Sequence, residues 1–252
     1  MSERKFEIQM SSGVAEAMYF SPEGVDQGPG VIHLPDIGSI REAHAQMCRQ
    51  LAARGYAVLM PNVFYRTSKV PVMDYKNKPT GEAMAKRVSE LMGPLTPEAM
   101  EQDCGFYIEA LASQKGVADG PMGAVGYCAT GRMAMRAAAA YPNKIAAAAS
   151  FHGASLYTDQ PNSPHLALPR IKAELYFGHA IEDKGMPQEA IAKFNASLAA
   201  WGGRYESEVY EGAYHSWTVP DSPVYNKPQA ERAFAKLAGL FDRTLKKRMA
   251  AS

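Results

Sequence analysis

The chain has 252 residues, an apolar fraction of 46% and a net charge of +1, with acids and bases mixed along it. This composition predicts a globular protein with a full-sized core and excludes a nucleic-acid footprint or a basic membrane-surface patch. Met1–Met10 is charged and lacks the apolar segment of a secretory signal, and no apolar run approaches the roughly 18 residues of a membrane span. We therefore expect a cytoplasmic protein that binds neither nucleic acid nor membrane.

The chain begins with a predicted antiparallel hairpin. Two runs of strand-forming residues, Phe6–Met10 and Val14–Phe20, flank the turn signal Ser11-Ser12-Gly13. Strands and helices then alternate, with Thr96 as the expected N-cap of the helix that begins at Pro97. In this half we predict strand Gly30–Leu34, helix Arg41–Arg54, strand Tyr56–Met60 and helices Glu82–Met92 and Pro97–Ser113.

The second half continues the alternation. We predict strand Gly123–Gly126, helix Arg132–Ala140, strands Ile145–Phe151 and Ala173–Phe177, helix Pro187–Trp201, strand Tyr205–Tyr210 and helix Gln229–Lys246. Such an order predicts an α/β fold, with a mostly parallel twisted sheet covered by helices on both faces. We find no linker, so residues 1–252 are expected to form a single domain. Sheets of this kind carry their sites at the carboxyl ends of strands.

Cys128 is the candidate nucleophile. It lies in Gly126-Tyr127-Cys128-Ala129-Thr130-Gly131, between a predicted strand and a predicted helix. This order is typical of a nucleophile elbow, although Cys replaces Ser in G-x-S-x-G and Thr130 stands in place of the last glycine. At a helix N-terminus a thiolate is favoured, and the N–H of Ala129 would face a developing oxyanion. The alternative is a small buried thiol, as in most free cysteines.

The two other cysteines, together with His33 and His44, are expected to have no part in the chemistry. Cys48 and Cys104 lie at helical positions that favour core packing, and the chain has no C-x-x-C pair. His33 is expected to pack inside a strand, and His44 to be solvated on its helix. No pair of histidines has a metal-ligand spacing with a third ligand, so we expect no metal and no cofactor.

Asp183 and His215 are the predicted partners of Cys128. In elbow hydrolases the acid follows the nucleophile in the chain, and the histidine comes last. Asp183 lies in the loop after Ala173–Phe177, with Glu182 as its rival, and His215 lies beyond the strand that starts at Tyr205. Each residue taken singly is more often a structural loop residue. Chain order and strand-end position agree for all of them, and together they predict a Cys–Asp–His triad.

The sequence resembles the dienelactone hydrolase family of α/β-hydrolases. The resemblance covers residues 5–245 and rests on G-Y-C-A-T-G at 126–131, the Asp183 loop up to Met186-Pro187, Y-E-G-A-Y-H-S-W at 210–217, P-D-I-G-S-I-R at 35–41 and L-A-A-R-G-Y-A-V-L-M-P-N at 51–62. It implies the α/β-hydrolase fold and a Cys128–Asp183–His215 triad that cleaves esters or lactones.

The resemblance also implies roles around the triad. Asp36 matches an acidic residue that contacts the resting thiol, and the backbone N–H of Ile37 would join that of Ala129 in binding the oxyanion. Enzymes of this type bind a substrate carboxylate with arginines, one of them shortly after the catalytic histidine. Here Ser216–Pro220 contains none. The substrate-binding candidate is Arg41, and the sequence leaves open the alternatives Arg66, Arg87 and Arg132.

Aromatic residues near the triad are candidate pocket walls. Tyr127, His152 and Trp217 follow or flank the strand ends that carry the triad. Core packing explains such side chains equally well, because aromatic residues also dominate cores.

The predicted reaction is hydrolysis of a small activated ester or enol lactone through a thioacyl-enzyme. A thiolate leaves more readily than most alkoxides, so a cysteine nucleophile suits substrates whose own leaving group departs easily. Two other classes of function remain open: a redox-sensing thiol at Cys128, and a catalytically silent binding module on the same scaffold. The sequence does not distinguish a monomer from a dimer.

Overall fold

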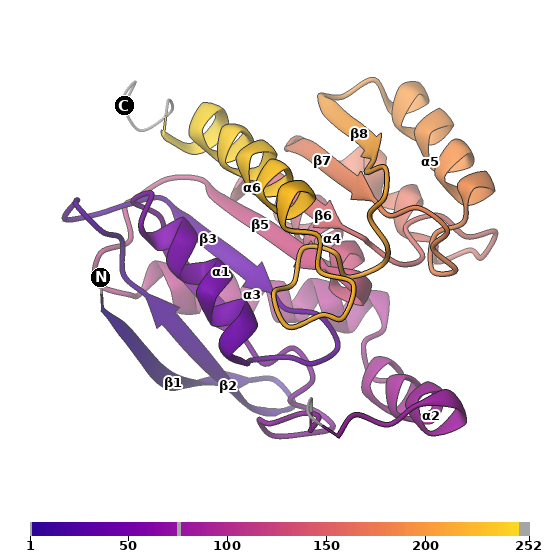
Figure 1. The fold of residues 1–252 in the computed structure, drawn as a ribbon. Coiled ribbons are helices and arrows are strands. Elements are labelled where there is room, and N and C mark those ends of the chain that lie inside the picture. Colours follow the sequence, from indigo (N-terminus) through magenta and orange to yellow (C-terminus); the bar gives the residue numbers. More distant parts are fainter. Residues whose placement is uncertain (1, 75–76, 247–252) are drawn as a thin grey trace. The chain divides into compact units, whose positions relative to one another are not determined.

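The computed structural model describes residues 2–74 and 77–246. The chain divides into two compact units, Met1–Ala118 and Asp119–Ser252, which we call unit 1 and unit 2. After the N-terminal hairpin, strands and helices alternate along the chain, as the sequence predicts (Figure 1). The expected single domain over residues 1–252 stays a prediction.

Unit 1 contains a sheet with the strand order β1-β2-β4-β3. Its strands are β1 (Glu3–Met10), β2 (Gly13–Phe20), β3 (Gly30–Leu34) and β4 (Ala57–Pro61). The predicted hairpin of β1 and β2 is confirmed; β2 runs antiparallel to β4, and β3 parallel to it. The helices are α1 (Glu42–Ala52), α2 (Gly81–Met92) and α3 (Pro97–Ala112). In Figure 1, α1 lies in front of these strands and α3 behind them.

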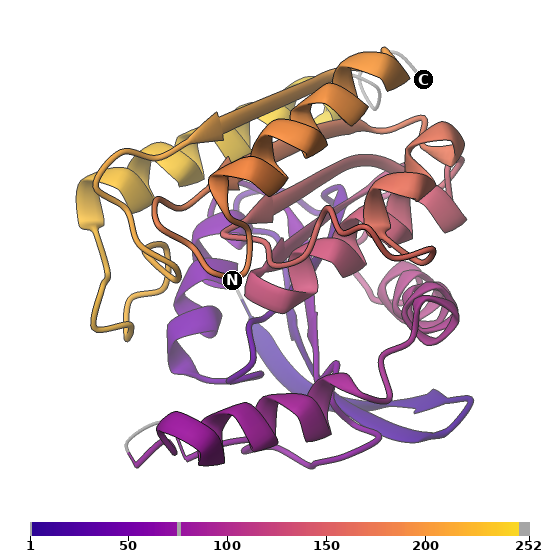
Figure 2. The same cartoon turned by 90° about the vertical axis from the view of Figure 1, so that its right-hand side faces the viewer.

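Unit 2 contains parallel strands in the order β5-β6-β7-β8. Its strands are β5 (Met122–Tyr127), β6 (Ile145–Phe151), β7 (Glu174–His179) and β8 (Tyr205–Val209). Its helices are α4 (Gly131–Ala140), α5 (Gln188–Trp201) and α6 (Lys227–Phe241), with the short helical turns η1 (Cys128–Thr130), η2 (Pro164–Arg170) and η3 (Asp242–Lys246). Figure 2 shows α5 in front of the strands of this unit and α6 behind them.

Strands β5 and β6 of unit 2 are covered on both faces. Every residue of β5 and β6 is buried, which explains why these segments read as continuous apolar runs without alternation. Small residues let the helices approach closely. A Cβ at Gly123 in β5 would lie 2.6 Å from the ring of Phe241, at the end of α6.

The predicted strands and helices are confirmed, with their ends displaced by a few residues. The largest difference lies in the last helix, because α6 ends at Phe241 and continues as the π-helical turn η3. There the hydroxyl of Thr244 donates to the carbonyl of Leu240 at 2.6 Å, in competition with the helical N–H donor.

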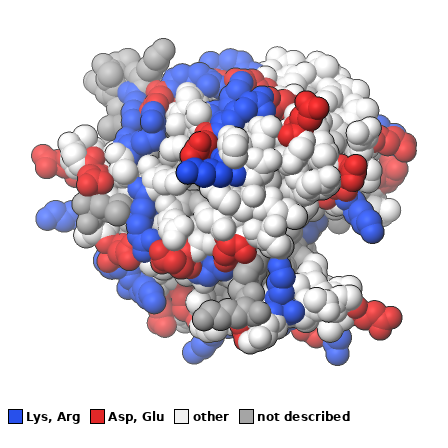
Figure 3. All heavy atoms as spheres, viewed as in Figure 1, with Lys and Arg blue, Asp and Glu red and all other residues white. Residues whose placement is uncertain are grey.

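The surface carries mixed charges. Figure 3 shows lysine and arginine side chains interspersed with acidic ones over the visible face, in agreement with the net charge of +1. Across residues 2–74 and 77–246, none of the helices combines the length and the apolar character needed to span a membrane.

The N-caps of α2 and α3 provide a matched test of helix stabilisation. The side chain of Thr96 accepts the N–H of Ala99 at 3.2 Å, whereas Thr80 makes no such bond at the start of α2. We expect Thr96→Ala to lower the free energy of unfolding by about 1 kcal/mol. Thr80→Ala should change it by less than about 0.5 kcal/mol. Urea denaturation measures both, and equal losses would contradict the assignment of the cap.

Candidate active site

Cys128 follows β5 directly and begins η1, which leads into α4. Its φ of +59° lies in the left-handed region, which costs a non-glycine residue about 1–2 kcal/mol. Its side chain is partly exposed, whereas Cys48 and Cys104 are fully buried, as predicted. A partly exposed thiol in a strained turn between strand and helix is the geometry of a nucleophile elbow.

The residues around Cys128 keep this turn tight. A Cβ at Gly126 would lie 2.2 Å from the carbonyl oxygen of Thr130, and one at Gly131 would lie 2.1 Å from the hydroxyl of Ser150. Gly131 therefore provides the close approach between helix and strand. Thr130, at the place of the expected glycine, closes the turn instead. Its hydroxyl accepts the N–H of Tyr127 at 3.0 Å and donates to the carbonyl of Tyr127 at 2.8 Å.

Asp183 lies in the loop between β7 and α5, and its side chain is 5% exposed. Its Oδ1 accepts the N–H of Gly185 at 2.8 Å, and its Oδ2 lies 2.7 Å from Nδ1 of His215. Glu182, the rival of Asp183 in the sequence, is exposed and has a φ of +49°. The structure thus brings Asp183 into contact with the histidine.

His215 contacts both of its predicted partners. Its ring is hydrogen-bonded to Asp183 and to Cys128, and its side chain is 32% exposed. Burial by itself would lower the pKa of His215. The hydrogen bonds and charges of Asp183 and Cys128 outweigh it and raise this pKa from 6.5 to about 10. At neutral pH the ring is therefore protonated and positively charged, with a carboxylate and a sulfur as its two partners.

The start of α6 holds the loop that carries His215. The backbone N–H of Asn226 donates to the carbonyl of Trp217 at 3.0 Å, and its side chain donates to the carbonyl of Gly212 at 3.2 Å. The side-chain oxygen of Asn226 also accepts the N–H of Gln229 as the N-cap of α6. The first residue before α6 therefore ties both ends of the loop that carries His215.

The predicted pocket walls are buried. Tyr127 is 3% exposed and stacks on Phe151, and Trp217 is fully buried against the ring of His152. This burial favours the packing alternative for Tyr127 and Trp217, and their contact with substrate stays a prediction. Thr218 was not among the residues predicted from the sequence, and its hydroxyl lies 2.8 Å from Nε2 of the fully buried His152. The only signal for Thr218 in the sequence was its place three residues after His215.

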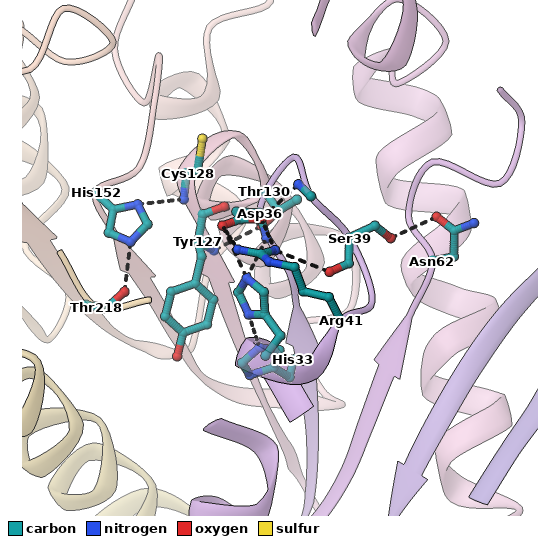
Figure 4. A network of polar contacts seen from close by, with 12 residues as sticks. His33, Asp36, Ser39, Arg41, Asn62, Tyr127, Cys128, Thr130, His152 and Thr218 are labelled. Carbon is teal, nitrogen blue, oxygen red and sulfur yellow. Dashed lines mark hydrogen bonds and ion pairs between the residues drawn. The ribbon is translucent and has the colours of Figure 1, made fainter. Parts of the chain in front are cut away.

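In unit 1, the residues after β3 form a closed polar network (Figure 4). The guanidinium of Arg41 donates to Oδ1 of Asp36 at 2.6 Å and to Oδ2 at 2.9 Å, and the N–H of Gly38 donates to Oδ1 at 2.8 Å. Burial would raise the pKa of Asp36, but the charges and hydrogen bonds of His44 and Arg41 hold it well below its ordinary value. Both carboxylate oxygens thus have partners within unit 1. The roles of Asp36 and Ile37 toward Cys128 stay predictions.

His44 belongs to the same network, and the prediction that it is solvated was wrong. It is fully buried, with Nδ1 2.8 Å from Nε2 of His33 and Nε2 3.4 Å from Oδ2 of Asp36. A polar ring can occupy the buried face of α1 because these partners satisfy both of its nitrogens.

Three of the four candidate arginines are engaged within unit 1. Arg41 donates to the carboxylate of Asp36, and Arg66 donates to that of Asp103. Arg87 donates to the hydroxyl of Ser68 and to the carbonyl of Val72. The predicted contact of Arg41 with substrate stays a prediction.

Arg132 differs from these three arginines. It lies in the first turn of α4 in unit 2, and its buried Nε has no hydrogen-bond partner among the described residues. Burial and the neighbouring Arg136 lower the pKa of Arg132, whereas an electrostatic interaction with Cys128 raises it. A partly buried guanidinium near the thiol is available to an anionic group.

The arrangement in unit 2 offers a nucleophile, a proton carrier and an oriented carboxylate. The N–H of Ala129 follows Cys128 at the start of the helical turn, where backbone donors are available to a developing negative charge. Within the described part of the chain, no cluster of three or more His, Cys, Asp and Glu residues is placed to hold a metal ion.

Known proteins resemble this chain in sequence. The model of the dienelactone hydrolase family matches residues 15–245. A carboxymethylenebutenolidase of Rhodococcus opacus is 24% identical over 235 residues, which cover 87% of this chain and 84% of that protein.

Solved structures also resemble this one. A presumed dienelactone hydrolase from Klebsiella pneumoniae superposes with a TM-score of 0.83 at 21% identity, over 95% of this chain and 98% of that one. A dienelactone hydrolase-like promiscuous phosphotriesterase from metagenomic libraries has a TM-score of 0.78 at 18% identity, over 96% and 98% of the two chains. At these identities the structural likeness shows the fold alone.

The raised pKa of His215 links stability to pH. The protonated ring contributes to the free energy of unfolding. This contribution is fully present below pH 6.5, the ordinary pKa of histidine, and it is lost as the pH rises through about 10. We therefore expect the stability difference between the wild type and His215→Gln to shrink between these pH values, as measured by urea denaturation.

His165→Gln is the matched control for this titration. Burial lowers the pKa of His165, so this variant should leave the slope above pH 7 unchanged. A stability difference for His215→Gln that is constant or grows with pH would show that the proton on His215 is not held as described.

Proposed function

Because the chain belongs to the dienelactone hydrolase family, has the α/β-hydrolase fold and is a lactone or ester hydrolase, we propose that Cys128, Asp183 and His215 carry out its reaction. The proposed substrate is a small activated ester or enol lactone. The observation that carries the proposal is the ring of His215, hydrogen-bonded to Asp183 on one side and to Cys128 on the other. This contact joins a loop histidine to a thiol in a strained turn.

In the first step the sulfur of Cys128, whose proton has passed to the ring of His215, attacks the carbonyl carbon of the substrate. A carbon–sulfur bond forms while the carbonyl π electrons move to oxygen. The N–H of Ala129 stabilises this oxyanion, a contribution of about 2.7–4 kcal/mol for one such donor. The tetrahedral intermediate collapses, the carbon–oxygen bond to the leaving group breaks, and His215 gives its proton to the departing alkoxide or enolate.

In the second step water releases the acid. His215, now neutral, takes a proton from water as the oxygen attacks the thioester carbonyl. The carbon–sulfur bond then breaks, and its electron pair returns to Cys128, so the resting state is restored. Asp183 orients the imidazole throughout and stabilises its charged form. Because a thiolate departs more readily than most alkoxides, activated esters and enol lactones suit this site better than amides.

Removal of the sulfur tests the nucleophile. We expect Cys128→Ala to lower kcat for an aryl ester or enol lactone by about 1000-fold or more, since no thioacyl intermediate can form. In the wild type, acid-quenched samples should show the acyl mass on the peptide that contains Cys128. Cys104→Ala is the matched control, because this buried thiol of α3 has no part in the reaction.

The outcomes also separate the alternatives. Undiminished turnover by Cys128→Ala would contradict the proposal. Sulfenic acid on Cys128 after peroxide treatment, without any acyl adduct, would favour a redox-sensing thiol. An intact fold that turns over none of a panel of aryl esters and enol lactones would favour a silent binding module.

Arg132 further suggests a negatively charged substrate. Its buried Nε has no partner among the described residues, and its guanidinium interacts electrostatically with Cys128. A buried donor without a partner is costly, and a carboxylate on the substrate would satisfy it with a charge-assisted hydrogen bond. We therefore propose that Arg132, rather than Arg41, binds an anionic group of the substrate.

A pair of substrates tests the role of Arg132. Arg132→Met should lower kcat/KM for a carboxylate-bearing aryl ester by about 10- to 100-fold, the range of one charge-assisted hydrogen bond. The corresponding neutral ester should change by less than about threefold. Arg204→Met, at an arginine whose side chain is 68% exposed in the same unit, is the control. Equal losses on both esters would show that Arg132 supports the fold instead.

A further inference from the structure

His152 is the first residue after β6, and its φ of +41° is left-handed, like that of Cys128. Its ring is fully buried. A buried polar side chain on a strained backbone persists where the surrounding contacts hold it, so these contacts indicate what it does.

The ring accepts a hydrogen bond from the backbone of the proposed nucleophile. The N–H of Cys128 donates to Nδ1 of His152 at 3.1 Å. A ring nitrogen that accepts carries no proton, so the proton of the neutral ring is on Nε2, which donates to the hydroxyl of Thr218 at 2.8 Å. Figure 4 shows His152 between these two partners. Because Thr218 lies shortly after His215, one ring joins the elbow to the loop of the histidine.

The same ring also packs against the imidazole of His215. Their centroids are 5.1 Å apart, and their planes meet at 62°. The indole of Trp217 backs His152 at 5.2 Å and is itself fully buried, which leaves the ring of His152 no room to turn away. A neutral ring suits this place, since a second imidazolium at such a distance would repel a protonated His215.

We propose that His152 is a positioning residue, whose Nδ1 holds the left-handed backbone of Cys128 and whose ring edge fixes the orientation of the His215 imidazole. The proposal rests on the proposed function in taking Cys128 and His215 as the reacting groups. From the sequence, His152 was expected to line the substrate pocket. The proposed role differs, because a fully buried ring can position Cys128 and His215 without contacting the substrate.

Two variants of the same shape test this role. Asn tolerates a positive φ and places its amide oxygen where Nδ1 lies, whereas Leu has no acceptor there. We expect His152→Leu to lower kcat for an aryl ester by about 10- to 100-fold while KM stays within about twofold, the effect of a misplaced reacting group. His152→Asn should recover most of kcat. His165→Asn, at a histidine of the same unit outside the site, should change neither constant.

Alkylation of Cys128 by iodoacetamide, followed by peptide mass spectrometry, gives a readout without substrate. We expect slower alkylation in His152→Leu than in His152→Asn and the wild type. If the wild type cleaves no ester, the proposed function fails, while the order of alkylation rates still tests His152. Equal kcat or equal alkylation rates in the two variants would overturn the proposal. So would a rise in KM at constant kcat, which a substrate contact produces.

A measurement on the wild type covers the case in which His152→Leu does not fold. The ¹⁵N resonances of the His152 ring should show an unprotonated Nδ1 and a protonated Nε2. A proton on Nδ1 would exclude the bond from Cys128 and overturn the proposal.

Discussion

The left-handed backbone of Cys128 is the constraint around which unit 2 is arranged. This conformation is unfavourable for a residue with a side chain, and several contacts offset its cost. The hydroxyl of Thr130 closes the turn, Gly131 lets α4 approach β6, and His152 accepts the N–H of Cys128 itself. These contacts hold the backbone of the strained residue, so its thiol remains available to the ring of His215.

Much of this arrangement could be predicted from sequence, because it depends on local order. A strand, a tight turn and a helix around Cys128 follow from the run of small residues at 122–140. The loops of Asp183 and His215 follow from where apolar runs end. In a parallel sheet, the ends of successive strands come to the same edge, so chain order alone brings these loops together. The expected alternation of strands and helices was correct for the same reason.

What could not be predicted depends on contacts between distant residues. Asp183 and Glu182 are adjacent acids, and only the path of the loop decides that Asp183 meets His215. His44 is buried because His33, on a neighbouring strand, satisfies it, and helical spacing does not reveal such a partner. The place of His152 depends likewise on a hydrogen bond between the ends of two strands. Propensity and pattern describe which residues share a face, but not which polar atoms pair across it.

Thr130 also matters for how related chains are found. In this elbow the hydroxyl of Thr130 closes the turn through its hydrogen bonds to the backbone of Tyr127. The glycine that permits close packing is Gly131, one residue later. A search pattern that demands glycine two residues after the nucleophile passes over this chain. A broader pattern, which admits threonine followed by glycine, would retrieve it and any others that build the same bend by this route.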